Sequence, residues 1–261
     1  MFIDTHAHIH MISTEKEIPV DEIIEDLKNN DVDTVVDICG TEDEFLFHQN
    51  VKKEFTNSNI DFYAAAGIHP HEADKFIDAD ISWIKNNSKE IFAIGEIGLD
   101  FFYDISSRKN QEIMLRTMVE QSIELNLPLL IHGRCGEEQI LKTLEEYKLQ
   151  NGRVLFHCYT GPFDIAERIL ANHWLISFSG ILTFKKSEDV RKIFMMTPPD
   201  QIFFETDSPF LAPVPFRGSV NTPAKVRCVY EYAAALRNID LDVLAAQVRR
   251  NFINFFNLQN G

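Results

Sequence analysis

Short apolar runs rich in β-branched and aromatic residues recur along the chain, and longer segments of helical period separate them. Runs of about four to eight such residues, bounded by polar or turn-forming residues, are typical of strands buried on both faces. Eight runs predict strands: FIDTH (2–6), TVVDIC (34–39), FYAAAG (62–67), FAIGE (92–96), PLLIH (128–132), RVLFH (153–157), WLISFS (174–179) and QIFFET (201–206).

A segment with apolar residues three and four positions apart follows each of these runs. This spacing lines one face of a helix, so each segment predicts a helix. After the eighth run, Thr222 suits an N-cap and Pro223 the first helical position. The predicted helices span 20–30, 42–55, 78–88, 108–125, 137–149, 163–172, 187–196 and 222–238, and a last one begins near Asp240 and ends in NFINFFNL.

Eight strands, each followed by a helix, fit a chain of 261 residues. This alternation favours an α/β fold of the (β/α)8 TIM-barrel type, and we expect one domain spanning residues 1–261. An open, doubly wound sheet is the structural alternative.

The composition is that of a globular chain, with 45% hydrophobic and 25% charged residues. It supplies enough apolar material for one core, and 21 phenylalanines indicate a bulky interior. No apolar run reaches the roughly 18 residues of a membrane span, and no basic, apolar leader is recognisable. We therefore expect a cytoplasmic protein with no membrane partner, whose four cysteines are reduced.

The net charge of −15 argues against a broad basic groove for nucleic acid. It leaves open a phosphate substrate held at one point, because bound cations can invert the sign of the local charge.

Histidines and carboxylates gather where the predicted strands end. Active sites of such barrels lie at the carboxyl ends of the strands. Side chains two positions apart share one face of a strand, so Asp4, His6 and His8 point the same way. The other candidates are His69 in GIHPH, Glu96 in GEIGLD, His132 and Arg134 in HGR, His157 after the sixth run and Asp207 in ETDSP.

Imidazole and carboxylate groups are suitable ligands for zinc, manganese or similar divalent cations. The six predicted ligands are His6, His8, Glu96, His132, His157 and Asp207. Six exceed the usual three of a catalytic site with one metal, so we expect two divalent cations, zinc, manganese or magnesium, with Glu96 bridging them. Two such ions with two carboxylates leave a charge of about +2, which suits an anionic phosphodiester.

Each residue alone also has a structural interpretation. A lone histidine at a strand end is commonly structural, Asp207 can cap a turn, and Glu96 between glycines can belong to a loop. It is the joint pattern that favours a metal site. We interpret His10, His48 and His173 as ordinary residues, the cysteines as small core residues, and Asp4 as a support for the site rather than a ligand.

Six stretches together resemble the signatures of the TatD family of metal-dependent hydrolases: DTHAHIH, GIHPH, GEIGLDFFYD, LPLLIHGR, FHCYTG and ETDSPFLAP, in the family's order over residues 4–213. The resemblance implies an amidohydrolase-like barrel. It implies one metal bound by His6, His8, Glu96 and Asp207, and another bound by Glu96, His132 and His157. It further implies a divalent-metal deoxyribonuclease, often one that trims single strands from the 3′ end.

The sequence departs from the family pattern at a few positions. Ile9 and His10 replace the usual leucine and aspartate, and Cys135 stands where aspartate is common. RGSVNTP (217–223) lacks the family's usual lysine and glutamate. The six ligand positions are intact, so the departures affect the expected substrate more than the expected metal chemistry.

We therefore predict a metal-dependent hydrolase, a phosphodiesterase or deoxyribonuclease that uses a metal-activated water. Asp207 and Glu96 are the predicted catalytic residues. His69, Arg134 and Arg217 are the predicted contacts to DNA or a small phosphodiester, and no obligate protein partner is inferred. The alternatives are an amidohydrolase or esterase, for example a D-aminoacyl-tRNA deacylase, and a non-enzymatic binding protein on a retained barrel.

Overall fold

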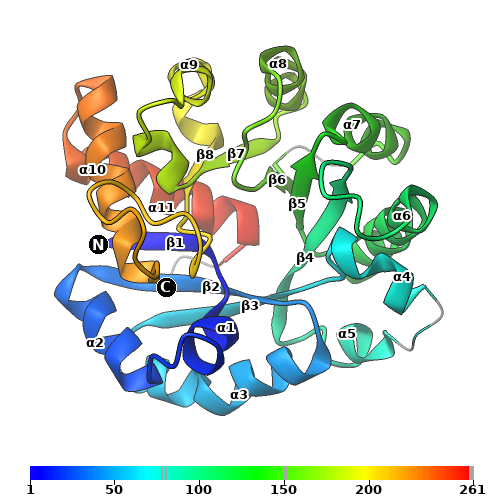
Figure 1. Cartoon of the computed structure of the whole chain (residues 1–261), viewed down its shortest axis with the longest axis horizontal. Coiled ribbons are helices and arrows are strands. Elements are labelled where there is room, and N and C mark those ends of the chain that lie inside the picture. The colour runs from blue at the N-terminus through cyan, green and yellow to red at the C-terminus, as the bar shows by residue number, and fades with distance from the viewer. Residues whose placement is uncertain (78, 80, 150–151, 259–261) are drawn as a thin grey trace.

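The computed structural model describes residues 1–77, 79, 81–149 and 152–258, and it contains one eight-stranded parallel sheet in the order β1 to β8 (Figure 1). The strands are β1 (Phe2–Ala7), β2 (Val32–Cys39), β3 (Asp61–Ala66), β4 (Ile91–Asp100), β5 (Leu129–Arg134), β6 (Val154–Phe156), β7 (Leu175–Phe178) and β8 (Ile202–Phe204). The predicted (β/α)8 barrel is confirmed. The single domain over residues 1–261 stays a prediction, and residues 259–261 lie outside the described part.

The first and last strands close the barrel. Ala7 forms a parallel bridge with Ser208. Next to it, the Asp207 amide donates to the His6 carbonyl at 3.0 Å, and the His8 amide donates to the Ser208 carbonyl at 2.9 Å. A doubly wound sheet would reverse its strand order midway, and this sheet does not.

Helices surround the sheet (Figure 1). The α-helices are α1 (Ile9–Thr14), α2 (Val20–Asn29), α3 (Glu42–Asn57), α4 (Ala73–Phe76), α5 (Ser82–Asn86), α6 (Arg108–Leu125), α7 (Glu137–Glu146), α8 (Phe163–Ala171), α9 (Glu188–Met196), α10 (Val226–Arg237) and α11 (Leu241–Phe256). Four short 3₁₀ turns are η1 (Pro70–Glu72), η2 (Gly180–Thr183), η3 (Pro199–Gln201) and η4 (Pro223–Lys225). No helix in these ranges is long and apolar enough to cross a bilayer, and a cytoplasmic location stays a prediction.

Three details differ from the sequence-based expectation. Helices α1 and α4 were not predicted, because one or two turns are too short to show a helical period. Of the helix predicted over 78–88, only α5 forms, and Asp78 and Asp80 lie outside the described residues. The helix predicted over 222–238 starts with the turn η4. Thr222 lies at the N-cap position and Pro223 at the first position, as predicted, but the Thr222 hydroxyl donates to Asp26 and makes no capping hydrogen bond.

Helix α11 covers the amino ends of the strands. The Asn251 side-chain amide donates to the carbonyl of Ile202, the first residue of β8, at 2.9 Å. The Phe252 ring packs against Tyr63 and Phe203, near the starts of β3 and β8. This end of the barrel is filled with apolar side chains, so the opposite end is left for a site.

Asp4 ties β1 to the chain that follows β8. Its side chain is fully buried. One carboxylate oxygen accepts from the amides of His6 (3.1 Å) and Thr206 (2.9 Å), and the other accepts from the Thr206 hydroxyl. That hydroxyl also accepts from the Ser208 amide at 3.2 Å. Asp4 therefore supports the barrel closure. Its carboxylate is hydrogen-bonded to one candidate metal ligand, His6, and there to the backbone amide rather than to the ring.

We expect Thr206→Val to destabilise the fold by about 1–3 kcal/mol, because it removes the hydroxyl donor from a buried carboxylate. Urea unfolding measures the change. Thr56→Val is the control, since the Thr56 hydroxyl is exposed on α3 and bonds only the Lys52 carbonyl. Equal stabilities of the two variants would show that the Asp4 network does not hold the closure.

Candidate metal centre

The six predicted ligands meet at the carboxyl end of the barrel. Glu96 lies at their centre, and its two carboxylate oxygens face a ring of imidazoles. The distances from those oxygens are 2.6 Å to His157 Nε2, 2.8 Å to His132 Nδ1, 3.3 Å to His6 Nε2 and 3.6 Å to His69 Nε2. One carboxylate thus lies within reach of four histidines from four strands or the loops that follow them.

Asp207 completes the group from the β8 side. Its Oδ1 lies 3.6 Å from His8 Nε2 and 3.7 Å from His6 Nε2. The residue has a φ of 53°, and its amide is held by the His6 carbonyl at 3.0 Å. The barrel closure therefore sets the position of this carboxylate.

Glu96 sits where β4 and β5 come unusually close. The register of the pair shifts between Ile94 and Ile97, and such irregularities re-aim a side chain. A Cβ on Gly95 would lie 2.5 Å from the Leu130 Cβ, and a Cβ on Gly98 would lie 1.8 Å from the His132 carbonyl oxygen. Only glycine at both positions lets the two strands bring Glu96 and His132 together.

Two buried carboxylates each bind a ring nitrogen of a candidate ligand, on the opposite side of the ring from Glu96. Glu205 binds His157 Nδ1 at 3.2 Å, and the Ser177 hydroxyl donates to its other oxygen. Asp100 binds His132 Nε2 at 3.2 Å and His71 Nε2 at 2.9 Å. A carboxylate on one ring nitrogen fixes which nitrogen faces the centre.

The electrostatic field at the centre favours a cation. Burial would raise the pKa of Glu96, but the surrounding imidazoles, that of His157 foremost, hold that pKa well below its usual range. Burial likewise opposes a charge on His157, yet Glu96 and Glu205 raise its pKa well above the usual value. Carboxylates that attract a proton to an imidazole attract a metal ion to the same place.

His69 differs from these histidines. Burial lowers its pKa to about 3, so its ring is neutral at physiological pH. Its Nδ1 accepts from the His71 amide at 3.2 Å, which leaves Nε2 directed toward Glu96. A neutral imidazole nitrogen in this position is suited to bind a metal as well as a substrate.

The residues fit the expected metal ions. Both ring nitrogens of His6 are buried and lack a hydrogen-bond partner among the described residues. A buried imidazole without a partner is costly, and a metal ion would satisfy it. Ligand atoms lie within 4.8 Å of one another in three groups here: His6–His8–Glu96, His69–Glu96–His132 and His6–His157–Glu205. Glu96 belongs to two of these groups.

The predicted substrate contacts lie in different surroundings. His69 joins the centre, as described. The Arg134 guanidinium lies over the Phe102 and Tyr103 rings, and that of Arg217 lies over the Phe184 ring at 3.7 Å. Among the described residues, neither guanidinium forms a hydrogen bond or an ion pair with a candidate ligand.

Asp100 and Glu205 had no role in the sequence-based interpretation. Their positions in the sequence nevertheless indicated a role. Asp100 lies four residues after Glu96, and Glu205 lies two residues before Asp207. Side chains an even number of positions apart share one face of a strand, so each is expected on the same face as a candidate ligand. The signal was weak because the predicted fourth strand ended at Glu96, whereas β4 continues to Asp100.

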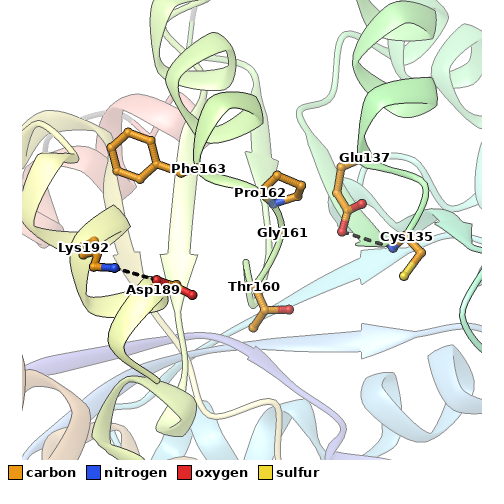
Figure 2. A pocket seen from close by; sticks show the side chains of 8 residues that line it. All are labelled: Cys135, Glu137, Thr160, Gly161, Pro162, Phe163, Asp189 and Lys192. Carbon is orange, nitrogen blue, oxygen red and sulfur yellow. Dashed lines mark hydrogen bonds and ion pairs between the residues drawn. The ribbon is translucent and has the colours of Figure 1, made fainter. Parts of the chain in front are cut away.

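A cavity of about 720 Å³ opens between the segments that follow β5, β6 and β7 (Figure 2). Cys135 and Thr160 border it, three residues beyond His132 and His157 respectively. Phe163 and the ion pair of Lys192 with Asp189 lie on its far side (Figure 2). None of the six candidate metal ligands is among its lining residues.

Comparisons with known proteins agree with this geometry. The family described as TatD related DNase matches residues 3–257. The metal-dependent hydrolase YabD of Bacillus subtilis is 31% identical and covers 99% of this chain and 100% of its own. The 3′-5′ ssDNA/RNA exonuclease TatD of Erwinia tasmaniensis is 29% identical over 75% of this chain and 78% of its own. The structure of YJJV, a TatD homolog from Escherichia coli, superposes with a TM-score of 0.86 at 22% identity, covering 99% and 98% of the two chains.

The barrel, the histidine–carboxylate centre and these relatives define a metal-dependent hydrolase. Because the family matches nearly the whole chain, the protein belongs to the TatD family.

We expect Glu205→Gln to weaken divalent-metal binding about 10- to 100-fold, because it removes the charge that orients His157. Equilibrium dialysis with metal analysis measures the affinity. Glu188→Gln, on the exposed start of α9, is the control. An unchanged affinity in the Glu205 variant would separate this carboxylate from metal binding.

Proposed function

We propose that the chain is a metal-dependent phosphodiesterase whose substrate is DNA. The observation that carries the choice of a phosphodiester is Arg134. In a chain of net charge −15, Arg134 lies two residues beyond the candidate ligand His132, and its guanidinium has no ion pair among the described residues. A planar, unpaired fork suits the two oxygens of a phosphate. The name of the Erwinia relative, an exonuclease for single-stranded DNA and RNA, supports the same substrate class.

In this proposal two divalent metals would share Glu96 as a ligand. His6, His8 and Asp207 would hold one of them, and His132 and His157 would hold the other, with His69 as a further candidate ligand. When bound, the metals lower the pKa of a water and stabilise the charge that develops on the phosphoryl oxygens.

The residues around the metals position and move protons. The Asp207 carboxylate accepts a proton at Oδ1 from the attacking water, for which it needs hydrogen-bond reach of about 2.6–3.2 Å. Glu205 and Asp100 keep the His157 and His132 rings from turning. Arg134 binds a phosphate of the substrate, and Arg217 is a second candidate contact.

A substrate panel tests the proposal. Protein supplemented in turn with zinc, manganese and magnesium is given single-stranded DNA, RNA, a small aryl phosphodiester, an aryl ester and a D-aminoacyl-tRNA. We expect hydrolysis of DNA and the phosphodiester, and a loss of several orders of magnitude in Glu96→Gln with the circular dichroism spectrum unchanged.

Hydrolysis of the acyl substrates alone would contradict the proposal and favour the amidohydrolase alternative. Near-native turnover in the Glu96 variant would contradict the bridging role. No turnover with any metal or substrate would favour a binding protein.

We expect Arg134→Ala to lower kcat/KM for DNA about ten- to a hundredfold, because a charge-assisted contact contributes about 1.5–3 kcal/mol. Both metals should stay bound, and hydrolysis of a small uncharged ester, where measurable, should change much less. Arg116→Ala is the control, since Arg116 pairs with Glu146 on the helical surface. Equal losses on DNA and ester would indicate a structural role for Arg134.

A further inference from the structure

The exposed aromatic side chains of the described residues share one end of the molecule. Every phenylalanine and tyrosine that is exposed among these residues follows β4, β6 or β8: Phe102, Tyr103, Phe163, Phe210 and Phe216. The carboxyl ends of these strands surround the candidate metal centre. Large apolar side chains exposed together mark a binding surface.

Phe102 and Tyr103 form a corner that holds Arg134. Their rings stand nearly perpendicular, at 87°, with centroids 5.0 Å apart. The Arg134 guanidinium carbon lies 4.1 Å from the Phe102 centroid and 4.5 Å from the Tyr103 centroid. We call these three residues the aromatic corner. Both residues remain more than half exposed, at 58% and 55%, so surface is left for a ligand.

Arg134 keeps its donors free. Among the described residues, every other arginine except Arg217 donates to a carboxylate, an amide or a carbonyl oxygen. Arg134 is held by ring faces instead. A cation–π contact fixes the plane of a guanidinium without occupying its N–H groups.

The aromatic corner is rigidly linked to the centre through Asp100. One oxygen of this carboxylate accepts from the amides of Phe102 (3.1 Å) and Tyr103 (2.9 Å). The other binds His132 Nε2, whose Nδ1 lies 2.8 Å from Glu96. The same carboxylate thus orients a candidate ligand and places the two rings beside it.

We propose that the aromatic corner is a subsite for the nucleotide next to the scissile phosphate. Its base stacks on the exposed ring surface of Phe102 or Tyr103, and Arg134 binds its phosphate. Stacking needs a free base face, which an unpaired strand offers and a duplex interior does not. Since the chain is strongly acidic, stacking here replaces the basic groove that other nucleases use along the backbone.

This inference rests on the proposed phosphodiesterase function. It assigns the selection of unpaired strands to Phe102 and Tyr103. The test compares the wild type with Phe102→Ala, Tyr103→Ala and the double variant. The substitutions keep the backbone amides that bind Asp100. Val243→Ala removes exposed apolar surface from α11, at the other end of the barrel, and is the control.

Two substrates are used with each variant: a fluorescent single-stranded oligonucleotide and a small aryl phosphodiester. We expect the double variant to raise KM for the oligonucleotide about five- to a hundredfold, while kcat/KM for the small phosphodiester falls less than threefold. The wild type should prefer the single strand to the same sequence in a blunt duplex, and the double variant should lose most of that preference.

Equal losses on both substrates would overturn the subsite, because they would show that the rings act only through Asp100. An unchanged KM for the oligonucleotide would overturn it too, and would leave the phosphodiesterase function standing. Failure of the wild type to cleave either substrate with any of the metals would instead overturn the proposed function, and the subsite with it.

Discussion

The pairing of β1 with the chain after β8 is the constraint on which the candidate centre depends. It brings His6 and Asp207, two hundred residues apart in sequence, within 3.7 Å of each other. The same closure buries Asp4, which then binds the amides and hydroxyl that flank the site. An open sheet of the same strands would leave His6 and Asp207 on opposite edges. The contacts that close the barrel therefore also bring the two sides of the candidate centre together.

Within the closed barrel, Glu96 organises the charge. A carboxylate buried in an apolar barrel is expensive unless paired, and here it is paired with imidazoles from several strands. These imidazoles are in turn oriented by Glu205 and Asp100. Carboxylates thus lie both inside and outside the ring of imidazoles, while both ring nitrogens of His6 lack a hydrogen-bond partner among the described residues.

Much of this arrangement was predictable from the sequence. The eight apolar runs gave the strand count because parallel strands buried on both faces read as continuous apolar segments. The candidate ligands could be placed because strand ends of a barrel converge. Strand lengths were less predictable: β4 extends four residues beyond the predicted end, through a register shift that no local pattern records. Asp100 was overlooked for that reason.

The surroundings of Arg134 were also beyond the sequence. The sequence predicts a substrate contact for Arg134, and this stays a prediction. The structure places its guanidinium over Phe102 and Tyr103, a contact between β5 and the segment after β4 that only tertiary folding brings about. Composition was informative in a different way. The net charge of −15 argues against a broad basic groove, and the proposed subsite assigns that role to exposed aromatic rings.

The most direct test of the account is an anomalous-scattering map from crystals grown with manganese or zinc. The account predicts two ions on either side of Glu96, one contacting His6, His8 and Asp207 and the other contacting His132 and His157. A single ion that leaves Glu96 unbound, or ions bound away from His6, would contradict it.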